Sequence, residues 1–280
     1  MIDVKYGFEI EDVRRFIEKL TPCKKVTFIT TSSRSPYVEK FGESPKSSQL
    51  ARNLAEKLKQ RDIKVEVIDA AKLNIHNCLG CVSELHGNNC GVKESAVKDD
   101  VKNPHGHLRC WASHDFEDDE LYKIANAIYD SQAVVFFGSQ RWGSVNAIYQ
   151  KVIERLDWME NMHSTLGEKS TIDNIMAGLV VIGQNWQVDQ SLTTQKKVLE
   201  FFGFQVPDEL FMGWQYTRDS NEESPEAYRD AVDTFEVAWN TPLFHWEKEK
   251  GTELDTDKKP NESDTNFRTF NEFINEVKNI

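Results

Sequence analysis

The chain has 280 residues, with 46 acidic side chains against 34 basic ones and a formal net charge of −12. That charge argues against nucleic-acid backbones and anionic membrane surfaces as main partners, because both are themselves negatively charged. The N-terminal stretch MIDVKYGFEIEDVRR is charged and has no apolar core of a signal peptide, and no apolar run is long enough to span a bilayer. We therefore expect a cytoplasmic protein with no membrane partner.

The first part of the chain alternates helical and strand patterns. Apolar residues at helical spacing predict a helix at 9–20, which Pro22 stops. A strand is predicted at 24–33 and ends in polar residues. Leucines and alanines on one face predict a helix at 47–60, and good alternation predicts a second strand at 63–70.

The middle of the chain contains a long segment without a period, followed by a return to alternation. Residues 71–117 are predicted to be a long loop with an insertion at 91–117. Gly203 is the predicted C-cap of a later helix. Apolar runs predict strands at 133–139, 175–183 and 204–212, and helical spacing predicts helices at 121–128, 145–156 and 189–202. This order predicts an α/β fold: a parallel sheet with helices on both faces.

Beyond residue 212 the pattern changes to helices joined by a polar stretch. Spacing from Tyr228 to Trp239 predicts a helix, 247–266 reads as a solvated linker, and 267–277 predicts a closing amphipathic helix. The aromatic face of that last helix needs a partner, either the main body or another subunit.

The loop after the first predicted strand is rich in hydroxyl groups. Ser32, Arg34, Ser47 and Ser48 lie between this strand and the next predicted helix. Hydroxyls and free amides at a helix N-terminus bind phosphate, and an arginine can bind phosphate oxygens through two hydrogen bonds. A simple N-cap role for either Ser47 or Ser48 is the alternative. The chain has no G-x-G-x-x-G and no P-loop, so the loop favours a mononucleotide such as FMN.

A second loop lies within the stretch VVFFGSQRWGSV at 134–145, where the apolar run VVFF leads into Gly138. Its two glycines would let main-chain amides approach a flat ring along Gln140–Gly143; the alternative is an ordinary turn with a packed Trp142. The order around Ser139 is not G-x-S-x-G, which disfavours a hydrolase nucleophile. After the next strand, Gly183 and Gln184 could border the same ligand.

Three segments together resemble the NAD(P)H-dependent FMN reductases of the flavodoxin-like superfamily. They are SSRSPYVEKFGESPKSSQLA, CLGCVSELHGNNC and GSQRWGSVNAIYQKVIERLDW, and the resemblance covers roughly residues 26–205. About ten extra residues between Arg34 and Ser47 depart from the family pattern, and Gln140 and Arg141 replace its proline and tyrosine. The third segment matches best, at Gly138, Ser139, Trp142, Gly143, Ser144, Ala147, Lys151 and Arg155.

The resemblance implies a flavodoxin-like, doubly wound, five-stranded parallel sheet of order 2-1-3-4-5, with extra N- and C-terminal helices. We expect an FMN-binding domain at 26–212, with a helical extension at 1–25 and a C-terminal extension at 213–280; the insertion at 91–117 and everything past 212 lie outside the resemblance. The FMN phosphate would be held by Ser32, Arg34, Ser47 and Ser48, the ring by Ser139, Gln140, Arg141, Trp142 and Gly143, and its far edge by Gly183 and Gln184.

The activity implied by the resemblance is that of an NAD(P)H-dependent oxidoreductase that passes electrons to a quinone or a similar small acceptor. The flavin carries the redox chemistry, so no catalytic acid–base pair is expected. A homodimer or homotetramer is expected, because flavin sites in this family lie near subunit interfaces.

Five cysteines, an odd number in a chain expected to be intracellular, argue against a disulfide framework. Cys78, Cys81 and Cys90 resemble the motif of iron–sulfur flavoproteins, with Glu84 where the remaining ligand would stand and Cys110 as a substitute. Our main expectation is no metal; an iron–sulfur electron carrier is one alternative, and a flavodoxin-like binding module without FMN is another. Zinc is also open, with these three cysteines and one of His105, His107, Cys110 or His114.

Overall fold

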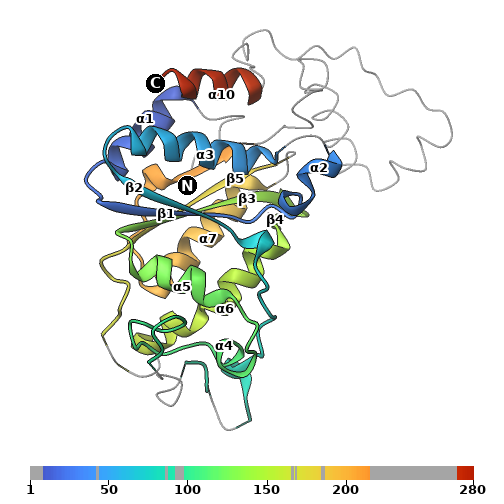
Figure 1. The fold of residues 1–280 in the computed structure, drawn as a ribbon, viewed down its shortest axis with the longest axis vertical. Coiled ribbons are helices and arrows are strands. Elements are labelled where there is room, and N and C mark those ends of the chain that lie inside the picture. Colours follow the sequence, from blue (N-terminus) through green and yellow to red (C-terminus); the bar gives the residue numbers. More distant parts are fainter. Residues whose placement is uncertain are drawn as a thin grey trace, which may run out of the picture.

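The computed structural model describes residues 9–41, 44–85, 88–91, 98–164, 167, 169–183, 187–214 and 270–280. The expected helix at 228–239, the linker at 247–266 and Gln184 lie outside these ranges. Within them the chain forms a layered α/β structure. A twisted sheet lies between two layers of helices (Figure 1).

The sheet is built from five parallel strands and one short antiparallel strand. The parallel strands are β1 (Lys25–Thr30), β2 (Lys64–Asp69), β3 (Ala133–Arg141), β5 (Met176–Ile182) and β6 (Phe211–Trp214). Their order is β2-β1-β3-β5-β6, and β4 (Ser144–Val145) pairs antiparallel with β3. The expected flavodoxin-like order, 2-1-3-4-5, is therefore confirmed for the parallel strands, and β4 adds a sixth strand that the sequence did not indicate.

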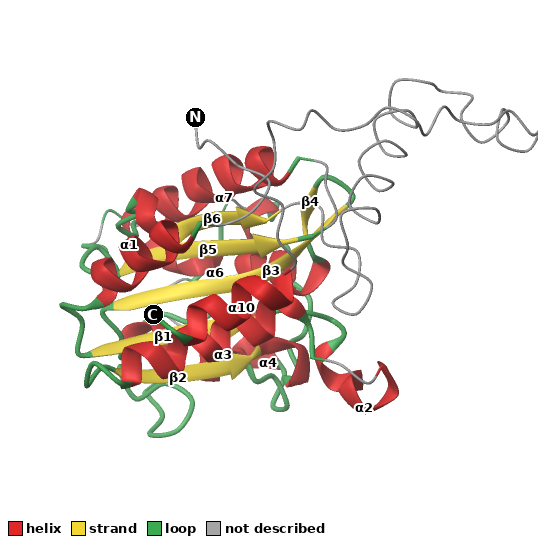
Figure 2. Cartoon of the chain, turned by 90° about the horizontal axis from the view of Figure 1, so that it is seen from above, coloured by secondary structure: helices red, strands yellow, loops and turns green. Residues whose placement is uncertain are grey.

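Helices cover both faces of the sheet. On one face lie α1 (Ile10–Leu20), α3 (Lys46–Lys59) and α10 (Phe270–Lys278), as Figures 1 and 2 show from two directions. On the other lie α5 (Leu121–Tyr129), α6 (Ala147–Ser164) and α7 (Val188–Phe202). The short helices α2 (Val38–Phe41) and α4 (Trp111–Asp115) belong to the loops after β1 and β2. The predicted C-cap is confirmed, because Gly203 closes α7 with a φ of 105°.

Three predictions differ from the structure: two element boundaries, and one segment predicted to be a loop throughout. Val145 was assigned to a helix but pairs with Gln140 in β4, and α6 begins at Ala147 and continues to Ser164. The predicted strand 204–212 is shorter and displaced: β6 begins only at Phe211 and continues to Trp214, because Pro207 supplies no amide hydrogen and a 3-10 turn occupies Asp208–Leu210. The predicted loop 71–117 also contains α4.

The core is continuous from α1 to α10. Phe16, Phe28, Phe137 and Phe273 are fully buried and belong to one apolar cluster. The N-terminal helix thus packs in the same core as the sheet, while the division into a domain at 26–212 and two extensions stays a prediction. Burial of aromatic side chains of this size is the main source of stability in such a core.

We expect Gly178→Ala to destabilise the sheet. A methyl group at Gly178 of β5 would lie 2.5 Å from both the Cβ and the main-chain oxygen of Leu210. Because backbone cannot move aside as a flexible side chain can, we expect a loss of about 1–3 kcal/mol in the free energy of unfolding. Urea denaturation of the two proteins measures this, and an unchanged midpoint would show that the Leu210 turn yields freely.

Candidate functional site

The N-terminus of α3 leaves hydrogen-bonding groups without protein partners. Its first intrahelical hydrogen bond runs from the Gln49 amide to the Pro45 carbonyl at 2.9 Å, so the amides of Ser47 and Ser48 have no intrahelical acceptor. The N-cap is Pro45, whose side chain cannot cap, and the simple N-cap role considered for the two serines is therefore wrong. The Ser48 hydroxyl is buried, with the residue 2% exposed, and makes no hydrogen bond. A buried hydroxyl in this state favours a ligand with acceptor oxygens.

The loop that leads from β1 toward α3 contributes two further predicted residues. Ser32 is buried directly after the strand, and its carbonyl accepts a hydrogen bond from the Ser35 amide at 3.0 Å. Arg34 is half-buried and precedes a 3-10 turn at Ser35–Tyr37. The turn is fixed to the end of β2 by a hydrogen bond from the Ser35 hydroxyl to the Asp69 carboxylate. A cation and a hydroxyl therefore lie at the carboxyl end of β1, where ligands of open parallel sheets bind.

The second predicted loop is a tight hairpin. Trp142 and Gly143 connect β3 to β4 with φ angles of 49° and 77°, and two positive values are what a type I′ turn requires. Glycine adopts this conformation freely, whereas a tryptophan is strained in it. Trp142 is 93% exposed, so the alternative of a packed tryptophan is wrong. An exposed aromatic ring held in a strained turn at the strand ends is a candidate ligand contact.

The hairpin is fastened to α7 by its polar side chains. Gln140 is buried, and its amide nitrogen donates to the Ser191 hydroxyl at 2.9 Å and to the Gln187 carbonyl at 3.3 Å. The Ser191 hydroxyl donates to the Gly143 carbonyl at 3.2 Å. Gly183, predicted to border the ligand, lies behind the hairpin, because a methyl group there would meet the Gln140 Cβ at 2.6 Å. The Gln140 side chain therefore serves to hold the hairpin, and its main chain remains the part predicted to face a ring.

One residue that sequence reasoning missed connects the two loops. Asn146 precedes α6 and is 4% exposed. Its side chain hydrogen-bonds both to Thr31, just before Ser32, and to the Ser139 amide. The available signal was an asparagine at the start of a helical pattern, which is typical of an N-cap, but the predicted helix at 145–156 included this residue. Nothing in that signal indicates a bridge between strands.

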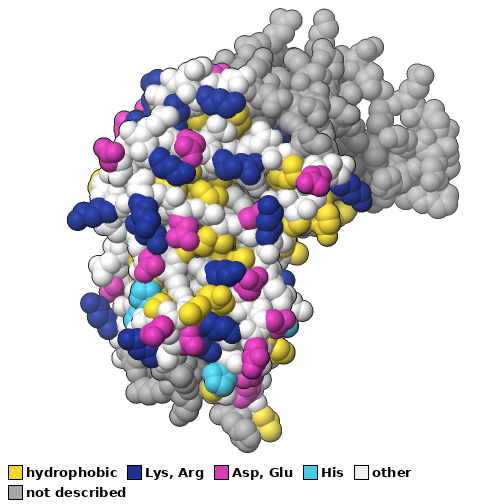
Figure 3. All heavy atoms as spheres, viewed as in Figure 1, with side chains coloured by type: hydrophobic (Ala, Val, Ile, Leu, Met, Phe, Trp, Pro, Cys, Tyr) yellow, Lys and Arg dark blue, Asp and Glu magenta, His cyan; other side chains and the backbone are white. Residues whose placement is uncertain are grey.

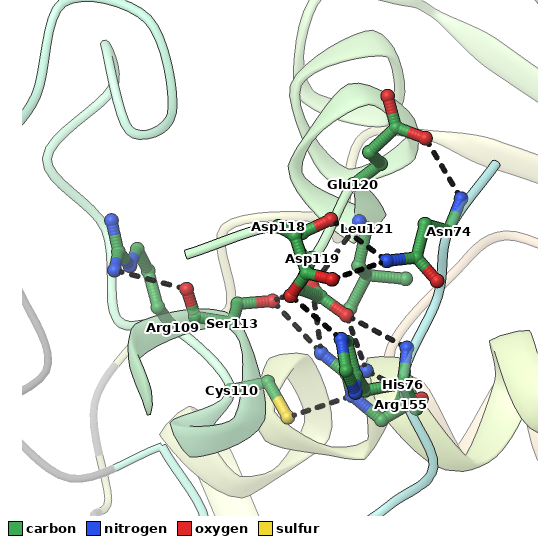
Figure 4. Close-up of polar contacts among 10 residues, drawn as sticks. All are labelled: Asn74, His76, Arg109, Cys110, Ser113, Asp118, Asp119, Glu120, Leu121 and Arg155. Carbon is green, nitrogen blue, oxygen red and sulfur yellow. Dashed lines mark hydrogen bonds and ion pairs between the residues drawn. The ribbon is translucent and has the colours of Figure 1, made fainter. Parts of the chain in front are cut away.

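The matched arginine of the third segment, Arg155, is structural. It is fully buried on α6 and forms a two-pronged ion pair with Asp119, at 2.8 Å and 3.0 Å (Figure 4). It also donates to the His76 carbonyl at 2.6 Å, the Ser113 hydroxyl at 2.9 Å and the Cys110 sulfur at 3.1 Å. These contacts fix the segment after β2 and the α4 region to α6, away from the strand ends.

The cysteines lie mainly in the interior. Cys81, Cys90 and Cys110 are buried, Cys78 is half-buried, and all are free thiols. Burial, and then the charge of Asp157, raises the pKa of Cys90, which disfavours the thiolate that a metal would bind. Among the described residues, no three cysteine, histidine, aspartate or glutamate side chains are arranged to hold a metal ion.

Apolar side chains gather at the same edge as the strand ends. On the face drawn in Figure 3 they cluster around α2, beside which Tyr37 is 57% exposed. Over the remainder of that face, acidic and basic side chains are intermixed with further apolar side chains and histidines. Across the described ranges, no helix has both the length and the apolar character needed to cross a membrane.

No family model and no curated protein matches the chain. Similar solved structures include RosB with its bound intermediate 8-demethyl-8-formylriboflavin-5'-phosphate, at 14% identity, a TM-score of 0.48 and 82% coverage of both chains. Others are an NADH:FMN oxidoreductase, EmoB, in its apo form (12% identity, TM-score 0.43, 77% of this chain and 89% of that one) and a flavone reductase (11%, 0.42, 78% and 64%).

The chain spans less than two thirds of the flavone reductase, at 64% of its length. At identities of 14% or less and TM-scores below 0.5, these similarities carry no conclusion about the fold or the activity of this chain.

Proposed function

We propose that this protein is an FMN-dependent NAD(P)H oxidoreductase that passes electrons to a quinone or a similar small acceptor. The observation that carries the proposal is the buried Ser48 hydroxyl, which has no partner, beside two amides without intrahelical acceptors at the N-terminus of α3. Such a group normally costs stability when unpaired, and a phosphate would satisfy it. The predicted phosphate ligands have the hydrogen-bond donors that the FMN phosphate requires, and none of them is a carboxylate.

The proposed phosphate ligands are Ser32, Arg34, Ser47 and Ser48. The hydroxyls and the α3 amides donate hydrogen bonds to phosphate oxygens, and Arg34 contributes the positive charge. This local preference for an anion is compatible with an acidic chain, because the net charge of −12 is a property of the whole molecule.

The proposed ring contacts are Ser139, Gln140, Arg141, Trp142 and Gly143, with Gly183 behind them. Fastening to α7 makes the hairpin a fixed support, and a positive charge on Arg141 would stabilise a negatively charged ring edge. A bound flavin supplies the redox chemistry itself. The residues of the chain need only orient it, limit access of water and leave one face open to the nicotinamide and then the acceptor.

The test is the visible spectrum of the purified full chain, before and after incubation with FMN. We expect flavin bands that bleach when NADH or NADPH is added without oxygen and return when a benzoquinone is added. A protein that takes up no FMN would overturn the proposal and favour the FMN-free binding module. Broad additional absorbance with bound iron would instead favour the iron–sulfur alternative.

A further inference from the structure

Asn146 forms a polar joint between Thr31, the residue after β1, and Ser139, which lies within β3. Its side-chain nitrogen donates to the Thr31 carbonyl at 2.6 Å, and its side-chain oxygen accepts from the Thr31 hydroxyl at 3.0 Å and from the Ser139 amide at 3.1 Å. Its own main-chain amide donates to the Ser139 carbonyl at 2.9 Å. The Asn146 side chain thus hydrogen-bonds to both segments at once.

This joint lies just where the main-chain ladder between the two strands stops. The paired residues of β1 and β3 end at Thr30 and Phe137, followed by one more hydrogen bond from the Thr31 amide to the Phe137 carbonyl at 3.0 Å. β3 then continues to Arg141 without β1 beside it. A carboxamide carries the same donor and acceptor as a peptide group. The Asn146 side chain can therefore take the place of the main-chain hydrogen bonds that β1 would otherwise make to this part of β3.

Packing around the joint leaves it little freedom. A methyl group on Gly138 would lie 3.2 Å from the Asn146 side-chain oxygen and 3.4 Å from the Thr31 hydroxyl. Thr31 is fully buried, and its hydroxyl also reaches the Phe137 carbonyl at 3.2 Å. The joint is therefore a close-packed contact.

We propose that Asn146 is a positioning residue that fixes the spacing between the phosphate-binding and ring-binding parts of the flavin site. This inference rests on the proposed function. One end of the joint, Thr31, directly precedes Ser32, and the other end is Ser139 itself. A ligand that engages both parts gains affinity from their fixed separation, whereas a ligand that engages one part does not.

The test compares FMN with riboflavin, which has the same ring system and lacks the phosphate. Dissociation constants are measured by flavin fluorescence for the wild type, Asn146→Ala and Thr31→Val. We expect Asn146→Ala to weaken FMN about tenfold and riboflavin less than about threefold, so that the preference for FMN falls. Thr31→Val keeps the contacts of Asn146 to Ser139 and should lower the preference in the same direction if Asn146→Ala fails to fold.

Asn161→Ala is the matched control, because Asn161 is a second buried asparagine, located on α6 itself, whereas Asn146 directly precedes that helix. It is 1% exposed, hydrogen-bonds to Asn88 at 2.7 Å and donates to the Cys90 carbonyl, remote from the strand ends.

A purely structural effect would lower the melting temperature in both asparagine variants and leave the FMN preference intact. If the wild type binds FMN and Asn146→Ala keeps its preference, the inference is overturned alone; if the wild type binds no FMN, the proposed function fails and takes the inference with it.

Discussion

Asp119→Asn is expected to lower the free energy of unfolding by about 3–5 kcal/mol. The Asp119 and Arg155 side chains are both completely buried, so the variant leaves an arginine without its carboxylate in a region that water does not reach. The same carboxylate accepts from the His76 amide at 3.0 Å and from the Ser113 hydroxyl at 2.8 Å, and these donors lose a charged acceptor as well. Urea denaturation followed by circular dichroism measures the difference.

Glu56→Gln is the control for this variant. Glu56 pairs with Lys59 at 2.8 Å on the exposed surface of α3, and such pairs contribute about 0–1 kcal/mol. If Asp119→Asn lowered the free energy of unfolding no more than Glu56→Gln does, this would contradict the structural role assigned to the buried pair.

The pair also predicts how stability depends on pH. Burial disfavours the charged form of Asp119, but hydrogen bonds from Arg155, the His76 amide and Ser113 outweigh it and hold the pKa of the carboxyl below its usual range. Because the pKa is lower in the folded than in the unfolded state, the stabilisation is complete above the unfolded value of about 3.9. It is lost as pH falls through the folded value. We therefore expect the difference in the free energy of unfolding between the wild type and Asp119→Asn to become smaller in that acidic range.

Arg34→Ala combined with Ser48→Ala is expected to weaken FMN binding by about a hundredfold or more, since hydrogen bonds to a charged group contribute about 1.5–3 kcal/mol each. Riboflavin binding should change little, because it has no phosphate. Fluorescence titration measures both ligands. Equal losses for FMN and riboflavin would refute the phosphate assignment.

Ser48→Ala alone separates binding from folding. Because the Ser48 hydroxyl is buried and unpaired in the protein, its removal should leave the stability of the ligand-free chain unchanged or slightly raised. The same change should weaken FMN. Arg52→Ala, on an exposed position of the same helix, is the control for a general loss of positive charge near α3.

The helices and the parallel strands could be predicted because their signals are local. The spacing of apolar residues in α1 and α3, and the continuous run in β3, each determine a regular element regardless of what it contacts. The hairpin at Trp142–Gly143 could not, because a tryptophan at a positive φ is against its own preference. The turn is held there by contacts from α7, which lies more than forty residues along the chain.

The site was predicted from residue types at strand ends, and this reasoning located the donors without showing which of them the protein uses itself. Gln140 illustrates the difference, since its side chain binds Ser191 and Gln187 of the protein. Ser48 illustrates the opposite outcome, a hydroxyl left without a partner. Asn146 was missed because its role depends on two strands meeting in space, and sequence spacing carries no such information.

The contact between α10 and α3 has a consequence for how the protein folds. The Lys57 ammonium donates to the Lys278 carbonyl at 2.6 Å across a separation of 221 residues, and Phe273 packs against Trp214 with ring centres 5.0 Å apart. Closing so large a loop has a high entropic cost, so α10 is expected to dock after the sheet has formed. Its amides should accordingly exchange hydrogen sooner than those of β3, through openings that leave the proposed flavin site intact.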